Sequence, residues 1–164
     1  MLRLTVFFLA SSLFGCSNHA ALLDTGHLSL RIRFDSRNPL INREFKRAIV
    51  FWARVLDLEW HEDSKSTCTI QVVDDPKTLE NVLARSDLGT GTISVNPNYD
   101  LSAPEWYATA IHEIGHLLGL PHNPSAHSVM FYIDIRGDEV LDASDIATLS
   151  SHHRMRAIPL RFGN

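Results

Sequence analysis

Apolar and polar residues alternate from Leu28 to Phe34, and this period of two predicts a half-buried strand. Apolar residues in the next segment, 42–59, recur instead at helical spacing and form one wide stripe, which predicts a helix over that range. Two later stretches, 68–73 and 92–95, are rich in β-branched residues and predict further strands. The segment between them is ambiguous, because Asp75 and Pro76 could open a short helix or residues 82–84 could form a strand.

Start signals mark two more helices towards the end of the chain. Ser102 and Glu105 form a capping-box pattern with Pro104 in the first turn, and an apolar stripe follows them. Asp142 is placed as the N-cap of a last helix that contains Asp145. The order of elements predicts an α+β domain with helices packed on a twisted sheet.

The first residues have the features of an export signal. A single cation, Arg3, precedes an apolar run over 4–14 that is too short to span a bilayer. The run ends before Cys16 in a pattern that resembles the lipobox of bacterial lipoproteins, although Phe14 stands where a small residue is usual. We expect a signal peptide at 1–15, a linker at 16–27 and one domain at 28–164. Lipidation of Cys16 would anchor the protein to a membrane, and ordinary cleavage nearby is the alternative.

Composition narrows the class of protein. The chain has 164 residues, 45% of them hydrophobic and 21% charged, which is typical of a single globular domain. The net charge of −4 gives no reason to expect a nucleic acid as partner, and two cysteines make no disulfide framework. We expect a monomer.

Ionisable residues interrupt the apolar stripe of the helix that follows Ser102, in the stretch HEIGHLLGLPH. His112 and His116 are four residues apart, so their imidazoles lie on one helix face and could hold one metal ion. Glu113 projects about 100° away from His112. A carboxylate in that place can take a proton from metal-bound water.

The end of the same stretch predicts a sharp turn. Gly119 can adopt the left-handed conformation that ends a helix, and Pro121 prevents the helix from resuming. The turn can bring His122 back to the same metal, and three imidazoles with one open position are typical of catalytic zinc. A buried helix with incidental histidines is the alternative, but five fixed identities should arise by chance in on the order of one chain in 10⁵.

The stretch HEIGHLLGLPH matches the metzincin signature H-E-x-x-H-x-x-G-x-x-H, and SVM at 128–130 resembles the Met-turn of that clan. The short spacing from the third histidine to Met130 is similar to the matrixins, the family of the matrix metalloproteinases. The resemblance implies a twisted, mostly parallel sheet with an active-site helix, a Met-turn and a C-terminal helix. It also implies a zinc endopeptidase that acts on protein or peptide substrates, with Glu113 as general base.

The resemblance extends to further residues. It implies that Ser128 and Asp145 support the Met-turn, although Ser144 stands where matrixins have a second aspartate. Ala108 matches a position that, in matrixins, helps to set the depth of the S1′ pocket, which takes the side chain after the scissile bond. Tyr132 stands where astacins and serralysins have a tyrosine that can reach zinc; it could instead form the pocket wall. The loop after residue 73 is too short for the structural zinc and calcium sites of matrixins, so we expect one catalytic zinc ion only.

Two other functions stay open. One is a non-catalytic zinc-binding surface lipoprotein, which the presence of Glu113 disfavours. The other is a zinc amidase acting on cell-wall peptides. We expect an exported protein, either anchored by lipid or secreted. Of the remaining histidines, His127 is expected in a loop, and His152 and His153 on the exposed side of the last helix.

Overall fold

The computed structural model describes residues 26–63, 69–131 and 141–156. These residues form a five-stranded sheet in the order β2-β1-β3-β5-β4. The strands are β1 (Leu28–Phe34), β2 (Leu58–Glu62), β3 (Ile70–Asp74), β4 (Ala84–Asp87) and β5 (Thr92–Val95). All neighbouring pairs are parallel except β4 and β5, which places the antiparallel β4 at one edge. The predicted α+β fold with a mostly parallel sheet is therefore confirmed.

The strand at the free edge settles the ambiguous segment. Residues 76–78 form a turn rather than a helix, and β4 begins at Ala84. Side chains of β4 alternate between partly buried and exposed, so Ala84 and Ser86 face the domain while Arg85 and Asp87 face outward.

The first helix, α1 (Pro39–Val55), begins three residues before the predicted start at residue 42. Asn38 caps it, since its side chain accepts a hydrogen bond from the Leu40 amide at 3.0 Å. The prediction that it continues to residue 59 is wrong. The helix ends at Val55, and the chain then forms β2, a strand that the sequence interpretation missed.

A segment from the end of the chain explains this early stop. The Arg156 amide donates to the Val55 carbonyl at 2.9 Å, and the Asp57 amide donates to the Arg154 carbonyl at 2.8 Å. These bonds satisfy backbone groups that a longer helix would have satisfied internally. The chain can then run on as β2 beside β1, pairing Leu28 with Leu58.

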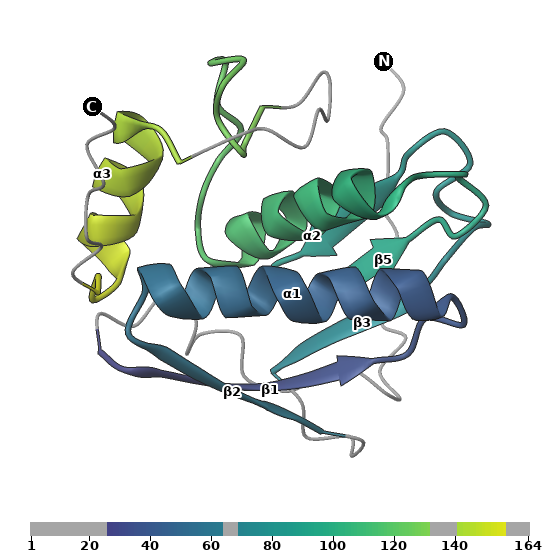
Figure 1. Ribbon diagram of the computed structural model, residues 1–164, viewed down its shortest axis with the longest axis horizontal. Helices are drawn as coiled ribbons and strands as arrows, with labels where there is room; N and C mark the ends of the chain where they lie inside the picture. Colours follow the sequence, from purple (N-terminus) through teal and green to yellow (C-terminus); the bar gives the residue numbers. More distant parts are fainter. Residues whose placement is uncertain (1–25, 64–68, 132–140, 157–164) are drawn as a thin grey trace, which may run out of the picture.

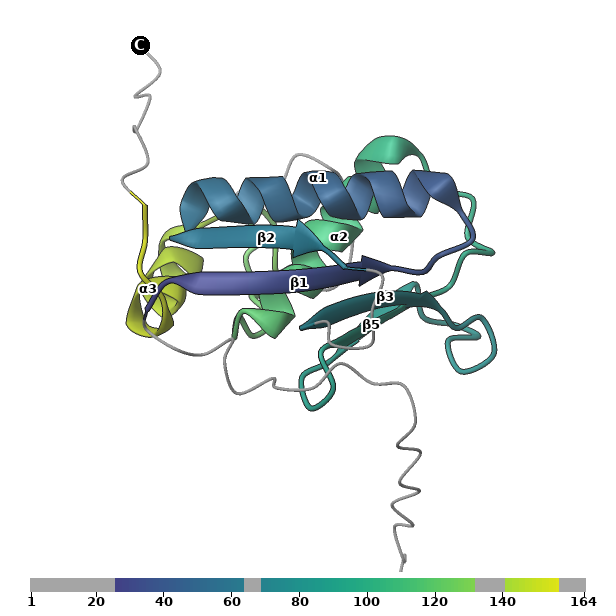
Figure 2. The same cartoon turned by 90° about the horizontal axis from the view of Figure 1, so that it is seen from below.

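The other two helices, α2 (Ala103–Leu117) and α3 (Ala143–His152), begin at the predicted caps. The Glu105 carboxylate accepts from the Ser102 amide at 2.8 Å, and the Asp142 carboxylate accepts from the amides of Ser144 and Asp145. Helices α1 and α2 lie side by side on the same side of the sheet, and α3 stands at one end of the domain (Figures 1 and 2). The core contains two tryptophans, Trp52 and Trp106, both essentially inaccessible to solvent.

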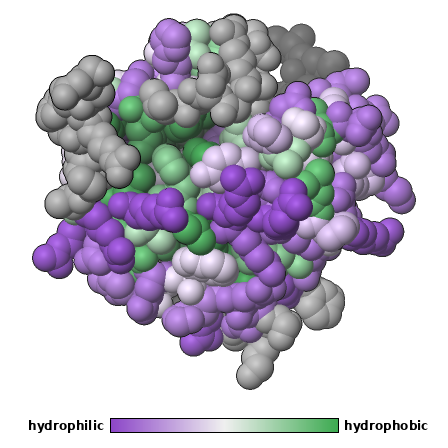
Figure 3. All heavy atoms as spheres, viewed as in Figure 1, coloured by the Kyte–Doolittle hydropathy of each residue, from purple (hydrophilic) through white to green (hydrophobic). Residues whose placement is uncertain are grey.

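The outer surface of α1 is hydrophilic. Arg43, Arg47 and Arg54 are exposed there, and hydrophilic residues cover much of this face of the molecule (Figure 3). No helix in the described ranges is both long enough and apolar enough to cross a membrane.

Candidate active site

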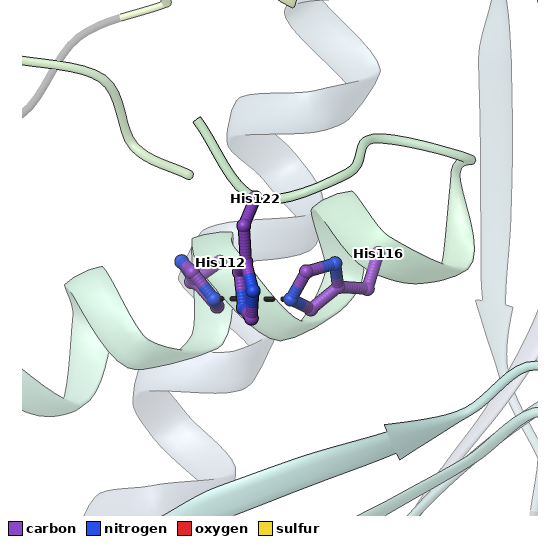
Figure 4. Close-up of side chains that lie close together, drawn as sticks. All are labelled: His112, His116 and His122. Atoms are coloured by element: carbon purple, nitrogen blue, oxygen red, sulfur yellow. Dashed lines mark hydrogen bonds between the residues drawn. The ribbon is translucent and has the colours of Figure 1, made fainter. Parts of the chain in front are cut away.

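Three histidines meet beside the C-terminal half of α2. His112 and His116 project from one face of the helix, and His122 projects towards them from the loop that follows it (Figure 4). One ring nitrogen from each lies within 4.8 Å of the other two. The structure thus brings together the three residues that the sequence interpretation chose as metal ligands.

Hydrogen bonds to backbone carbonyls orient the two helical rings. His112 Nδ1 lies 2.9 Å from the Val129 carbonyl oxygen, and His116 Nδ1 lies 2.8 Å from the Leu120 carbonyl oxygen. Because a carbonyl oxygen only accepts, each Nδ1 carries the hydrogen and each neutral ring keeps its lone pair on Nε2.

The two Nε2 atoms face each other 3.1 Å apart (Figure 4). Neither has a hydrogen to donate, so two lone pairs would repel unless a cation lay against both. Two nitrogens bound to one tetrahedral zinc ion lie about 3.3 Å apart, given zinc–nitrogen distances of about 2.0–2.1 Å. The observed separation therefore fits a shared zinc ion.

Burial keeps these histidines neutral at physiological pH. It lowers the pKa of His112 to about 4, against the effect of the Val129 hydrogen bond, and it lowers the pKa of His116 and of His122. Neutral imidazoles bind metal ions, whereas imidazolium rings do not. Three neutral imidazole nitrogens are one of the donor sets found in catalytic zinc sites.

A helix-ending motif positions the third ligand. The Leu120 amide donates to the Gly115 carbonyl at 3.0 Å and the Gly119 amide donates to the His116 carbonyl at 2.9 Å, the pair of bonds that defines a Schellman motif. Gly119 has a φ of 90°, which favours glycine. The motif does two things: it turns the chain towards His122 and it presents the Leu120 carbonyl to His116.

Glu113 lies on the neighbouring side of α2, and its side chain is buried. Burial raises the pKa of its carboxyl, while the hydrogen bonds from Ser86 and the nearby Arg85 guanidinium act to lower it. The Ser86 hydroxyl, on β4, lies 2.5 Å from Glu113 Oε2. The edge strand thus contributes directly to the surroundings of the predicted general base.

The Met-turn (128–130) is fixed from α3. The buried Ser128 hydroxyl donates to Asp145 Oδ2 at 2.6 Å and accepts from the Met130 amide at 2.9 Å. The same carboxylate oxygen accepts from the Asp142 amide at 3.1 Å. Asp145 therefore links the start of α3 to the Met-turn. The Met-turn holds the Val129 carbonyl against His112.

Asn123 is a site residue that the sequence interpretation missed. Its side-chain amide donates to Asp145 Oδ1 and Ser144 Oγ at 2.8 Å and to Asp142 Oδ2 at 2.9 Å. Its backbone amide donates to the Met130 carbonyl at 2.9 Å. Asn123 directly follows a metal ligand, so these bonds fix that ligand's backbone to both the Met-turn and α3. The neighbouring sequence gives no indication that this polar loop residue is buried.

Gly115 was also missed, although it lies inside the histidine motif. A Cβ atom at this position would lie 2.7 Å from Met130 Sδ and 3.3 Å from Trp52 Cζ2. Met130, which is fully buried, therefore packs directly against the backbone of α2 between the two helical histidines. The absence of a side chain at Gly115 is what permits this contact.

Other predicted residues lie apart from the cluster or outside the described ranges. Ala108 is partly exposed on α2, one turn before His112, and its role in a pocket stays a prediction. Cys16 and Tyr132 lie outside the described residues. His127 is exposed in the loop, as expected.

The prediction for His153 is wrong, because this residue lies beyond the end of α3 and is buried. Its Nε2 lies 2.8 Å from the Leu118 carbonyl oxygen, at the end of α2. His153 therefore joins the ends of two helices instead of facing solvent.

Comparisons with known proteins agree with this geometry. Residues 94–153 match the matrixin family. Among solved structures, the chain is similar in fold to one titled "Structure of myroilysin", with a TM-score of 0.55 and 15% identity over 75% of this chain and 91% of that chain. A search of curated proteins found no match.

The matched segment contains α2 with its two histidines, the loop with His122, the Met-turn and α3. The surrounding sheet and helices are similar in fold to the myroilysin structure. Over residues 94–153 the chain is therefore similar to the matrixin family, and this segment contains all three histidines of the cluster.

Proposed function

We propose that this protein hydrolyses peptide bonds in protein substrates, with one zinc ion held by His112, His116 and His122 and with Glu113 as general base. The observation that carries the proposal is the pair of facing Nε2 atoms, 3.1 Å apart, on rings whose Nδ1 atoms are engaged by carbonyl oxygens. A zinc ion bound there would polarise the scissile carbonyl and lower the pKa of water.

Glu113 supplies the proton transfers in this scheme. Its carboxylate takes a proton from the attacking water and later gives it to the leaving amine. Burial, which raises the pKa of this carboxyl, makes it a stronger base than an exposed glutamate.

The substrate would bind along β4. This strand pairs with β5 on one side and lies at the edge of the described sheet, so its other side can accept an extended peptide as an added strand. Backbone hydrogen bonds of that kind do not depend on the side chains of the peptide. Because Ser86 of β4 contacts Glu113, a peptide paired with β4 would lie close to Glu113.

The test separates metal binding from chemistry. Glu113→Ala should still bind one zinc ion per chain but cleave a mixed peptide library at least about 10²-fold more slowly. His116→Ala should lose the metal itself, and a chelator should abolish cleavage by the unaltered protein. The exposed Glu80 provides a matched control, since Glu80→Ala should leave both zinc content and turnover unchanged. A Glu113→Ala protein with normal turnover would refute the mechanism.

Export and anchoring by lipid at Cys16 belong to the same proposal. The support is the sequence pattern before this cysteine. Anchoring at residue 16 would leave the linker at 16–27 between the bilayer and β1.

A further inference from the structure

On the edge strand β4, a polar side chain, Ser86, contacts Glu113 of α2. Ser86 is one of the two β4 residues that face α2, and such positions usually hold apolar side chains. Its Oγ lies 2.5 Å from Glu113 Oε2 and 2.8 Å from the backbone carbonyl oxygen of Glu113. A single side chain from one strand therefore contacts one residue of α2 twice.

The hydroxyl has one hydrogen and two acceptors within reach. While Glu113 is charged, its carboxylate is the stronger acceptor, so the hydrogen points to Oε2. The terminal torsion of a glutamate is broad and roughly two-fold, so a carboxylate without such a partner would sample many orientations. Ser86 fixes this torsion because β4 is held by its pairing with β5, in which Ser86 lies opposite Ile93.

We propose that Ser86 is a positioning residue for Glu113: its hydroxyl holds Oε2 and thereby aims the other carboxylate oxygen, Oε1, at the attacking water. This inference rests on the proposed function, in which Glu113 is the general base. The Ser86 hydroxyl contacts Oε2, so in this proposal Oε1 is the oxygen that takes the proton.

The role predicts a specific kinetic effect. Misplacing a catalytic group by about 1 Å can cost about 10²-fold in rate, so Ser86→Ala should lower kcat by about 10- to 100-fold. KM should change by less than about twofold, because a defect in positioning the base acts on the transition state rather than on substrate binding. Ser86→Thr keeps the hydroxyl and suits a strand, so it should restore kcat to within about threefold of the unaltered protein.

Controls separate positioning from a general loss of structure. Ser94 on β5 lies opposite Arg85 in the register, and Ser94→Ala should leave kcat unchanged. Zinc content and zinc affinity of Ser86→Ala should equal those of the unaltered protein. In the zinc-free protein, Ser86→Ala should lower the urea midpoint of unfolding, and it should lower it by less when Glu113 is already alanine, because only the hydrogen bond to the backbone carbonyl of residue 113 is then lost. This double-mutant cycle measures the Ser86–Glu113 contact without any turnover.

The outcomes distinguish the two proposals. If Glu113→Ala is inactive while Ser86→Ala retains full kcat, the positioning role is wrong and the proposed function stands. Loss of zinc in Ser86→Ala, or a failure of threonine to restore kcat, would also overturn the role, since either result indicates a structural defect. If Glu113→Ala turns over normally, the proposed function fails and the role of Ser86 fails with it.

Discussion

Replacing Gly115 by alanine tests whether the Met-turn is a rigid support beneath the histidines. In the middle of an exposed helix, this substitution would stabilise the protein by about 1 kcal/mol, because alanine is the better helix former. At Gly115 the added Cβ would lie 2.7 Å from Met130 Sδ and 3.3 Å from Trp52 Cζ2. The expected sign of the change therefore depends on whether these neighbours can move.

The structure favours a net loss of stability. Non-bonded heavy atoms pack best at about 3.5–4.0 Å, so the contact with Met130 is too short by roughly 1 Å. Met130 and Trp52 are both 0% exposed, so neither side chain has room to turn into solvent. Overpacking of a well-filled core costs about 1–3 kcal/mol. Once the helix term of about 1 kcal/mol is subtracted, Gly115→Ala should lower the free energy of unfolding by up to about 2 kcal/mol.

Urea unfolding of the zinc-free protein measures this change, provided that the slope with urea stays constant. Ala108→Gly calibrates the helix term, since residue 108 is partly exposed on the same helix and should lose about 1 kcal/mol. A Gly115→Ala protein that is more stable than the unaltered one by about 1 kcal/mol would show that Met130 yields freely and that the turn is not a rigid support.

Three further predictions concern other parts of the chain. Asn123→Ala should weaken zinc binding about 10-fold in a competition titration with a chelator, because the backbone beside His122 loses its ties to α3; unchanged affinity would contradict this. Burial lowers the pKa of His153 below its ordinary value of 6.5, so the folded state binds fewer protons than the unfolded state and stability should fall as pH drops below about 6.5. His153→Gln should reduce this loss between pH 7.5 and 5.5, whereas His152→Gln, at a half-buried position, should not. Cys16→Ser should move the protein from the membrane fraction to the soluble fraction or leave the signal uncleaved, and a soluble unaltered protein without lipid mass would contradict the anchor.

The sequence predicted those parts of the fold that depend on local patterns. Alternation over Leu28–Phe34 and the capping residues Ser102 and Asp142 act within a few residues of themselves, and the corresponding elements are confirmed. The helix boundary at Val55 is different, because it depends on hydrogen bonds with Arg154 and Arg156, about a hundred residues away. The hydrophobic pattern within α1 therefore cannot predict where the helix ends.

The same distinction applies to the site. The spacing of His112, His116 and Glu113 is a property of one helix, so their relative placement follows from the sequence alone. Ser86 and Asn123 act through residues 27 and 22 positions away, respectively, and serine and asparagine in a loop or edge strand are usually solvated. Their contributions emerge only when the sheet edge and α3 are placed against α2.

The dependence of the metal site on α3 has a consequence for how the protein is made. Asp145 holds both the Met-turn and the segment after His122, yet it lies more than twenty residues beyond His122, the last of the three clustered histidines. During synthesis, all three imidazoles therefore emerge from the ribosome before the residue that fixes their supporting loop. Until α3 docks, the histidines of the nascent chain lack this support, so the cluster is complete only after the last helix has folded.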